Sequence, residues 1–250
     1  MVGVAVAACM ATACGGSSSS SSLTDTTATS DEIVVFAASS LAEAFVAIGD
    51  AFSAANPGVS VTFQFAGSSE LAGQLVNEAP AHVFASADEE NMATVVDAGR
   101  VTGTPIRFTA NTMQIVTAAG NPLGIASLAD LADPALTVVL CAEEVPCGRY
   151  SQQMLDAAGV SVAPKSLERS VKAVLSKVSL GEADAGIVYR TDVIAAGDAV
   201  SGVDIDPSVV ATAMYPIVAV VQSSAAAAFI DFVLSAEGQR ILAKFGFGAP

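Results

Sequence analysis

The first 99 residues of this 250-residue chain contain no lysine or arginine, and the first basic side chain is Arg100. The same stretch holds eleven acidic residues, and the whole chain has 25 Asp and Glu against 10 Lys and Arg. Such a chain offers no basic face to displace the counterions of a nucleic acid, so we expect no nucleic-acid partner. Any anion bound by this stretch has to be held without cationic side chains from it.

Histidine and catalytic motifs are also scarce. The chain has one histidine, His82, and lacks G-x-S-x-G, P-loop, H-E-x-x-H and G-x-G-x-x-G motifs. His82 begins an apolar strand, where a structural role is the more common one. We therefore predict a protein that is not an enzyme and that has no cofactor and no resident metal. The alternative from another class is a secreted hydrolase with Ser40 or Ser68 as nucleophile and His82 as base.

The N-terminus predicts export. Residues 1–14 are mostly small and apolar, end at Cys14 and lead into a Gly/Ser tract. This run has the length of a signal-peptide core and is too short to span a bilayer. It resembles a bacterial lipoprotein signal, with Cys14 as the lipidated residue and residues 15–31 as a flexible tether. Cys9 is the second candidate, and an ordinary secretory signal with incidental cysteines is the alternative.

Strands and helices alternate from Glu32 onward. The first unit is expected to have strands at 32–36, 60–65 and 82–87 and helices at 41–54, 69–78 and 88–99. The second unit is expected to have strands at 136–141 and 185–189 and helices at 149–158, 167–180 and 191–196. Two helical pieces close the chain. This order predicts largely parallel sheets flanked by helices.

Two long extended segments, 106–119 and 211–221, are expected to pass between the units. We therefore predict an α/β protein of two lobes, each a mostly parallel sheet flanked by helices. Lobe 1 would be discontinuous and comprise residues 31–110 plus 215–250, and lobe 2 would comprise residues 111–214.

Two strand–helix junctions share one pattern. "VVFAASSLAEAF" at 34–45 and "FQFAGSSELAGQL" at 63–75 both read F-A-x-S-S followed by L-A, with Ser40 and Ser68 at the junctions. A serine at a helix start caps the helix by accepting a backbone N–H. It can also donate to an anion, which a helix N-terminus attracts. Since ligands lie at the carboxyl ends of parallel strands, the repeat favours the interpretation that these serines also donate to a bound anion, in polar pockets built the same way.

Two further segments carry candidate site residues. "CAEEVPCGRY" at 141–150 predicts a disulfide between Cys141 and Cys147 in an exported chain. That bridge would stiffen a loop whose backbone N–H groups face a ligand. "GIVYRTDV" at 186–193 places Tyr189 at a strand end, where its hydroxyl can donate one hydrogen bond into a cleft.

In this order, "VVFAASSLAEAF", "FAGSSELAGQL", "APAHVFASAD", "VPCGRY" and "AGIVYRTDV" resemble the periplasmic molybdate-binding proteins of ABC-type importers. The resemblance extends over residues 33–247. It implies a type II-like periplasmic binding protein with its ligand cleft between the lobes. It also implies that a tetrahedral oxyanion is held by neutral donors, namely the hydroxyls of Ser40, Ser68 and Tyr189 and the backbone N–H groups of Cys147 and Val171.

The chain departs from the family pattern at two of these motifs. Cys147 stands where many members have alanine, which a backbone contact tolerates. His82 replaces an acid that is not an oxyanion ligand. Arg149 and Arg190 lie beside the motifs, and we predict that neither contacts the anion.

The resemblance implies a monomeric receptor that captures molybdate and delivers it to an ABC permease. Tungstate, almost the same size, would bind as well. Donors alone discriminate against protonated anions such as phosphate, but only cavity size separates sulfate. The protein would lie in the cell envelope, at the outer face of the cytoplasmic membrane, and contact the membrane only through its lipid anchor. A receptor for another oxyanion such as sulfate, or a sensor lobe without a transport role, are the alternatives.

Overall fold

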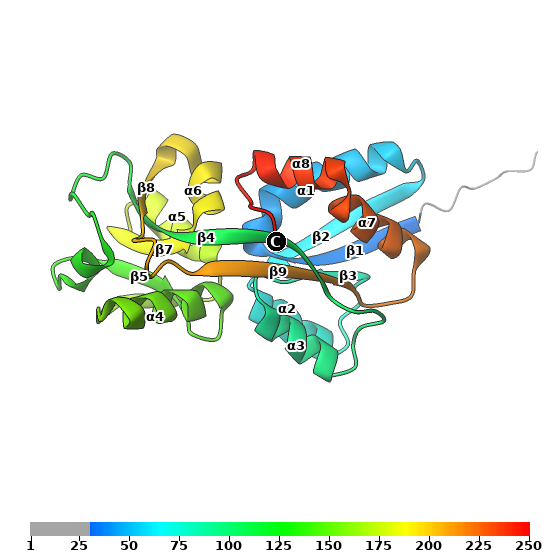
Figure 1. Ribbon diagram of the computed structural model, residues 1–250, viewed down its shortest axis with the longest axis horizontal. Coiled ribbons are helices and arrows are strands. Elements are labelled where there is room, and N and C mark those ends of the chain that lie inside the picture. The colour runs from blue at the N-terminus through cyan, green and yellow to red at the C-terminus, as the bar shows by residue number, and fades with distance from the viewer. Residues whose placement is uncertain (1–30) are drawn as a thin grey trace, which may run out of the picture.

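The computed structural model describes residues 31–250 and shows two lobes side by side, joined by two long strands (Figure 1). The predicted signal peptide, the lipid site Cys14, its alternative Cys9 and the tether up to residue 30 lie outside the described residues. Within the described part of the chain, no helix combines the length and the apolar character that crossing a membrane requires.

The first lobe is built on three parallel strands in the order β2-β1-β3, namely β1 (Asp31–Ala38), β2 (Val59–Ala66) and β3 (Val83–Ala85). Helices α1 (Ala42–Ala55), α7 (Ser224–Leu234) and α8 (Ala236–Lys244) lie on one face. Helices α2 (Ser68–Val76) and α3 (Glu89–Asp97) lie on the other (Figure 1). Parallel strands covered on both faces bring the starts of α1 and α2 to one edge of the sheet.

The second lobe repeats this plan with the parallel strands β6-β5-β7, namely β5 (Val138–Cys141), β6 (Ser166–Glu168) and β7 (Ala185–Tyr189). Helix α4 (Pro146–Ala158) covers one face, and α5 (Val171–Ser179) and α6 (Arg190–Ala196) cover the other (Figure 1). Short 3-10 turns lie at Ser39–Leu41, Leu128–Ala132 and Gly197–Ala199, and β8 (Val200–Asp204) closes the edge beside the crossing strand.

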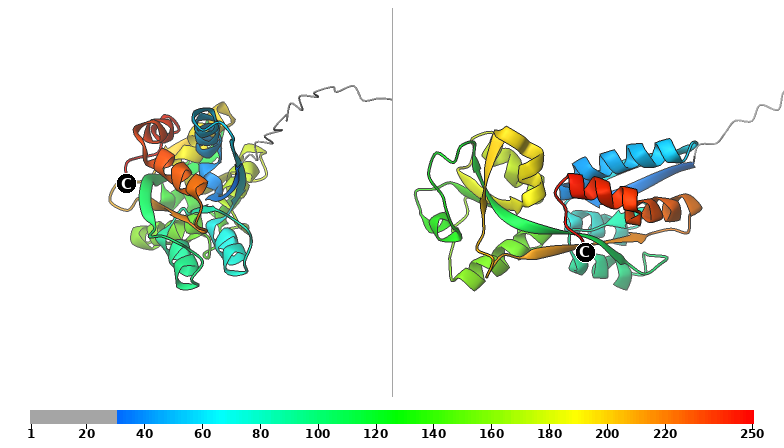
Figure 2. Two further views of the ribbon diagram at one scale, coloured as in Figure 1. Left: turned by 90° about the vertical axis from the view of Figure 1, so that its right-hand side faces the viewer. Right: turned by 45° about the horizontal axis from the view of Figure 1, so that its top comes forward.

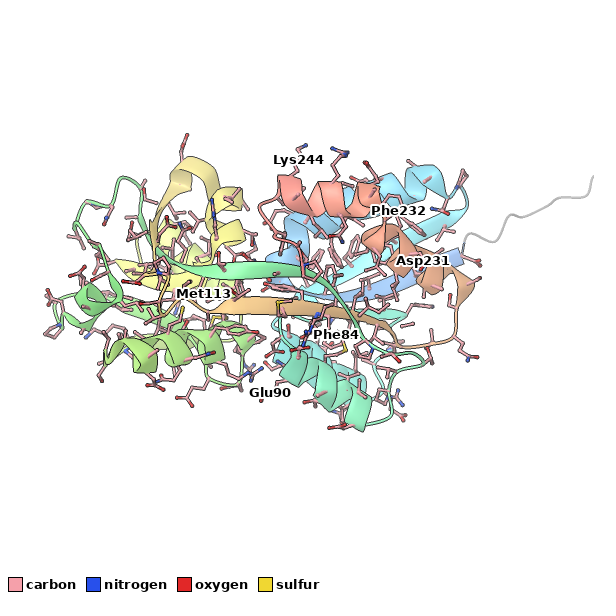
Figure 3. The ribbon with its side chains drawn as sticks, in the orientation of Figure 1. Phe84, Glu90, Met113, Asp231, Phe232 and Lys244 are labelled. Atoms are coloured by element: carbon pink, nitrogen blue, oxygen red, sulfur yellow. A yellow bond between two sulfur atoms is a disulfide. The ribbon has the colours of Figure 1, made fainter. Side chains whose placement is uncertain are left out.

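Two antiparallel strands, β4 (Ile106–Ala118) and β9 (Thr212–Ala219), connect the lobes (Figure 2). β4 pairs with β9 up to Thr112 and with β7 and β8 from about Met113 onward. Met113 therefore marks where the strand changes lobe (Figure 3). The two-lobed α/β prediction is confirmed, although these crossings make the continuous sheet mixed rather than mostly parallel. The lobe bounds 31–110 plus 215–250 and 111–214 stay a prediction.

An aromatic cluster fixes α1 and α7 on the first lobe's sheet. The Phe45 ring lies 5.8 Å from Phe108 and 6.1 Å from Phe229, and Phe52 meets Phe229 edge to face at 5.4 Å. Burying such a side chain stabilises the fold by roughly 1.5–3 kcal/mol. Because α1 starts directly after Ser40, this packing also fixes the position of that serine.

The helix predicted over residues 167–180 is wrong in its first turn. Ser166–Glu168 pairs with β5 as the edge strand β6, and the helix begins only at Val171. Ser170 separates the two elements, since its side chain accepts a hydrogen bond from the Ala173 N–H at 3.3 Å. The strand β8 was also not predicted. Only one of its five residues is buried, so its hydrophobic pattern is too short to indicate a strand.

Candidate functional site

A small cavity lies between the lobes, where six backbone segments meet. Its lining comprises residues of the first lobe and residues of the second: Ala38, Ser39, Ser40, Ala66, Gly67, Ser68, Ala87, Val145, Pro146, Cys147, Val171 and Tyr189. All five predicted oxyanion ligands are among them, and no lining residue is charged. The cavity has a volume of about 10 Å³, close to the least that holds one water molecule, so it has to widen to admit an oxyanion.

Ser68 is the first residue of α2 and is fully buried. Its Oγ accepts a hydrogen bond from the Ala87 N–H at 3.0 Å, and it makes no cap bond to its own helix. The predicted capping role is therefore wrong. A hydroxyl that already accepts from a backbone donor still carries its own hydrogen, which remains available for donation within the cavity.

Ser40 lies in the 3-10 turn Ser39–Leu41, which leads from β1 into α1. Its Oγ lies 2.8 Å from the hydroxyl oxygen of Tyr215, a buried residue of β9. This serine also makes no cap bond to the helix that follows, so the predicted cap is wrong here too. The two matched junctions place two hydroxyls in one cavity, as expected, but each hydroxyl bonds away from its own helix.

The first turn of α4 supplies one backbone donor. Pro146 has no N–H, and the N–H groups of Gly148 and Arg149 donate to the Val145 carbonyl at 2.9 and 3.1 Å. The N–H of Cys147 is left without a bonding partner among residues 31–250. The predicted disulfide is confirmed: Cys141 at the end of β5 is bonded to Cys147 and ties this turn to the sheet.

The start of α5 supplies a second backbone donor. The backbone carbonyl oxygen of Ser170 accepts hydrogen bonds from the Ala173 and Val174 N–H groups, at 3.2 and 3.4 Å. Val171, the first helical residue, is buried, lines the cavity, and keeps its N–H without a partner within the described chain. Unpaired N–H groups at a helix start carry the positive end of the helix dipole.

Tyr189 completes the set of donors. Its side chain is 1% exposed, and its hydroxyl has no hydrogen-bond partner among the described residues. Burial raises the pKa of this hydroxyl well above its usual value, so it stays protonated and neutral. A buried hydroxyl without a partner costs roughly 1–3 kcal/mol, which singles it out as a group built to meet a ligand.

Two cations that directly follow or lie close in sequence to lining residues, Arg149 and Lys172, are paired with carboxylates. Arg149 of α4 forms an ion pair with Asp88 and a second one with Glu90 at 3.1 Å. Lys172 of α5 pairs with Glu43 at 2.8 Å and Asp192 at 3.1 Å. Asp88, Glu90 and Glu43 belong to the first lobe, so both cations bridge the lobes.

Lys172 shows a raised pKa although burial opposes it, because Asp192 and Glu43 stabilise its charge. Arg190 is exposed, with no ion pair in the part of the chain that the structure describes. Arg149 and Arg190, which we predicted not to contact the anion, are both absent from the lining of the cavity.

His82 is far from the serines. Its Nδ1 accepts a hydrogen bond from the Val34 N–H at 3.0 Å. Val34 lies four residues before the end of β1 at Ala38, which corresponds to about 13 Å of strand before the turn that carries Ser40. The imidazole is therefore not within reach of Ser40, and the arrangement that a hydrolase would need is absent from the described residues. Within residues 31–250, no group of three His, Cys, Asp or Glu side chains is placed to hold a metal ion.

Sequence reasoning missed the residues behind Ser40. Tyr215 and Asn111 lie on the crossing strands β9 and β4, and the Asn111 amide nitrogen lies 3.5 Å from the Tyr215 hydroxyl. Both crossing strands were expected from the sequence, but their register, which brings Tyr215 against a serine 175 residues away, carries no local signal.

Comparisons with known proteins agree with this geometry. Residues 33–248 match the family described as bacterial extracellular solute-binding protein. The molybdate-binding protein ModA of Mycobacterium tuberculosis is 46% identical over 241 residues, 95% of this chain and 92% of that protein. The protein of the same name from Escherichia coli is 31% identical over 237 residues, 86% of this chain and 88% of that protein.

Solved structures show the same fold. The substrate-binding domain of a putative molybdenum ABC transporter from Clostridium difficile aligns with a TM-score of 0.65 at 26% identity, over 88% of this chain and all of that one. The periplasmic molybdate-binding protein of Azotobacter vinelandii aligns with a TM-score of 0.75 at 20% identity, over 87% and 99% of the chains. The chain therefore belongs to the bacterial extracellular solute-binding protein family and, within it, to the molybdate-binding proteins.

Proposed function

We propose that this protein is an extracytoplasmic receptor that captures molybdate, and tungstate with it, and delivers the anion to an ABC permease. One observation carries the proposal: four hydroxyl-bearing side chains, including those of Ser40, Ser68 and Tyr189, and two helix-terminal N–H groups surround a small cavity between two lobes, and no lining side chain is charged. The names of the close relatives point to the same ligand.

Neutral donors suit a receptor that must release its ligand. The dianion would be held by charge-assisted hydrogen bonds from Ser40, Ser68 and Tyr189 and by the helix starts at Cys147 and Val171. A buried, unpaired arginine in the same place would be costly whenever the cavity held no anion. The ion pairs of Arg149 and Lys172 hold the lobes together outside the cavity, which leaves anion recognition to hydrogen-bond geometry.

The test is titration calorimetry of the chain from residue 31 with molybdate, tungstate, sulfate and phosphate. Molybdate and tungstate should bind tightly, and phosphate should bind far more weakly. Ser40→Ala and Ser68→Ala should each weaken molybdate binding about ten- to hundredfold, since a hydrogen bond to a charged group contributes roughly 1.5–3 kcal/mol. Ser69→Ala, next to Ser68 but outside the lining, is the matched control. Equal binding by wild type and both cavity variants would reject the site, and a preference for sulfate would change the ligand.

We also propose that the mature chain acts as a monomer anchored by a lipid on Cys14. The support is the small-residue run that ends at this cysteine and the Gly/Ser tract that follows it. Mass spectrometry of the N-terminal peptide from a bacterial membrane fraction tests the anchor. Lipid on Cys9, or an unmodified N-terminus, would contradict it.

A further inference from the structure

A buried chain of polar groups runs behind Ser40, outside the cavity. The Tyr215 hydroxyl lies 2.8 Å from Ser40 Oγ, and the Asn111 amide nitrogen approaches the same hydroxyl at 3.5 Å. The same nitrogen donates to Thr191 Oγ1 at 2.8 Å. All four side chains are buried, and neither Tyr215 nor Asn111 lines the cavity.

A backbone group fixes the orientation of the Asn111 amide. The Thr112 N–H, which can only donate, bonds to Asn111 Oδ1 at 3.0 Å. The other end of the amide is therefore the NH₂ group, which donates to Thr191 and to Tyr215. The Tyr215 oxygen can accept from Asn111, and Ser40 Oγ is the one acceptor among the described residues for the Tyr215 hydrogen, so we infer that this hydrogen points to Ser40 Oγ. The Ser40 oxygen then accepts, and its hydrogen is left for the cavity.

We propose that Tyr215, oriented by Asn111, is a positioning residue that turns Ser40 into a fixed donor and thereby selects fully deprotonated oxyanions. The inference rests on the proposed function and deepens it. A hydroxyl free to rotate can accept as well as donate, so it would tolerate a ligand that carries an O–H group. A hydroxyl already engaged as an acceptor presents its hydrogen to the ligand and penalises such a ligand.

Ser68 is also engaged as an acceptor, but through one direct hydrogen bond. Ser68 Oγ accepts directly from the Ala87 N–H at 3.0 Å, so a main-chain donor lies behind this hydroxyl as well. Both serines thus present hydrogens to the cavity because a backbone N–H stands at the far end of each hydrogen-bond chain. Only the chain behind Ser40 passes through side chains, which makes it accessible to substitution.

The test is a double-mutant cycle of Tyr215→Phe and Ser40→Ala, with molybdate and phosphate affinities measured by calorimetry. Tyr215→Phe should weaken molybdate binding about tenfold. It should weaken phosphate binding less, so that the preference for molybdate falls. In the Ser40→Ala background the tyrosine substitution should have almost no further effect. Tyr150→Phe removes a hydroxyl from a tyrosine outside the lining and should change neither affinity.

An equal loss for both anions, or the same loss with and without Ser40, would overturn the inference, because a general structural disturbance gives that result. If wild type binds none of the anions, the proposed function fails. Neutron diffraction on the ligand-free protein then decides the inference separately. A deuterium bonded to the Tyr215 oxygen and pointing to Ser40 supports it, and one bonded to Ser40 and pointing to Tyr215 overturns it.

Discussion

The Tyr189 hydroxyl is buried at the cavity and bonds to no residue between 31 and 250, whereas Ser40 Oγ lies 2.8 Å from the Tyr215 hydroxyl and Ser68 Oγ accepts from the Ala87 N–H. Tyr189→Phe removes this hydroxyl and keeps the ring, which packs at 5.9 Å from the Tyr215 ring. We expect molybdate affinity to fall about tenfold or more, while the free energy of unfolding stays the same or rises by up to about 1 kcal/mol. Calorimetry and urea unfolding measure the two effects. A variant that binds normally, or one that loses stability along with affinity, would contradict a role as ligand donor.

At the residue scale, the sequence predicted which hydroxyls line the cavity but not what they bond to. Two serine junctions and a strand-end tyrosine were visible as local patterns, and all three line the cavity. What each hydroxyl bonds to was not visible, because serines at such junctions usually cap the helix and their actual partners come from other segments of the chain. Ser40 meets Tyr215 and Ser68 meets Ala87 only once the sheet has formed.

The disulfide at the start of α4 belongs to the scale of single elements. It closes a loop of sequence separation 6 and holds the turn that carries the Cys147 N–H. Replacing both cysteines by alanine keeps that N–H but frees the turn. We expect the free energy of unfolding to fall by roughly 2–3 kcal/mol by the chain-entropy argument. We also expect weaker molybdate binding. Denaturant unfolding and calorimetry on oxidised, reduced and variant protein check this, and unchanged affinity after reduction would contradict it.

The buried carboxyl at the start of α6 predicts a pH dependence. Burial raises the pKa of Asp192 to about 6, although Lys172 opposes the shift. In the unfolded chain this group titrates near 3.9. Between these values the folded state holds a proton that the unfolded state lacks. The contribution of Asp192 to stability is therefore highest below about pH 4, falls as pH rises through this window, and is lowest above about pH 6.

Asp192→Asn mimics the protonated carboxyl and removes this titration. The difference in unfolding free energy between variant and wild type should shift in favour of wild type as pH falls from 7 to 4, on the order of 2–3 kcal/mol. Urea unfolding at several pH values measures it, with Asp198→Asn at an exposed position as control. A difference that does not change with pH would show that Asp192 stays charged throughout.

Most helices and strands were predicted from their hydrophobic periodicity and from residues that start or end them, as α3 shows. Its predicted capped start at Asp88 is confirmed, because the Asp88 side chain accepts from the Asn91 N–H. The short edge strand β6 was absorbed into a predicted helix, since three residues carry too little pattern to be recognised. The parallel core of each lobe followed from the element order, but the antiparallel pairing of β4 and β9 depends on contacts between distant segments.

At the scale of the whole molecule, the lobes meet closely at Gly67. A Cβ at this position would lie 2.3 Å from the Arg169 carbonyl oxygen of the second lobe, although the Gly67 backbone angles suit alanine. Gly67→Ala should therefore keep the lobes apart and weaken molybdate binding by tenfold or more.

Gly73→Ala, where the added Cβ meets nothing within 4 Å, is the control and should stabilise α2 by about 0.5–1 kcal/mol. Small-angle X-ray scattering with and without molybdate, together with calorimetry, distinguishes the Gly67→Ala variant from the Gly73→Ala control. A Gly67→Ala protein that compacts and binds like wild type would show that this contact does not limit closure.

The position of the bound anion tests the neutral-donor site most directly. Crystals of the chain from residue 31 grown with molybdate can be measured at the molybdenum absorption edge, where the metal gives an anomalous signal. We predict one strong peak in the cavity, with oxygens within hydrogen-bond distance of the Ser40, Ser68 and Tyr189 hydroxyls and of the Cys147 and Val171 N–H groups. A peak against Arg149 or Arg190, or a cavity without a peak at saturating molybdate, would contradict recognition by neutral donors between the lobes.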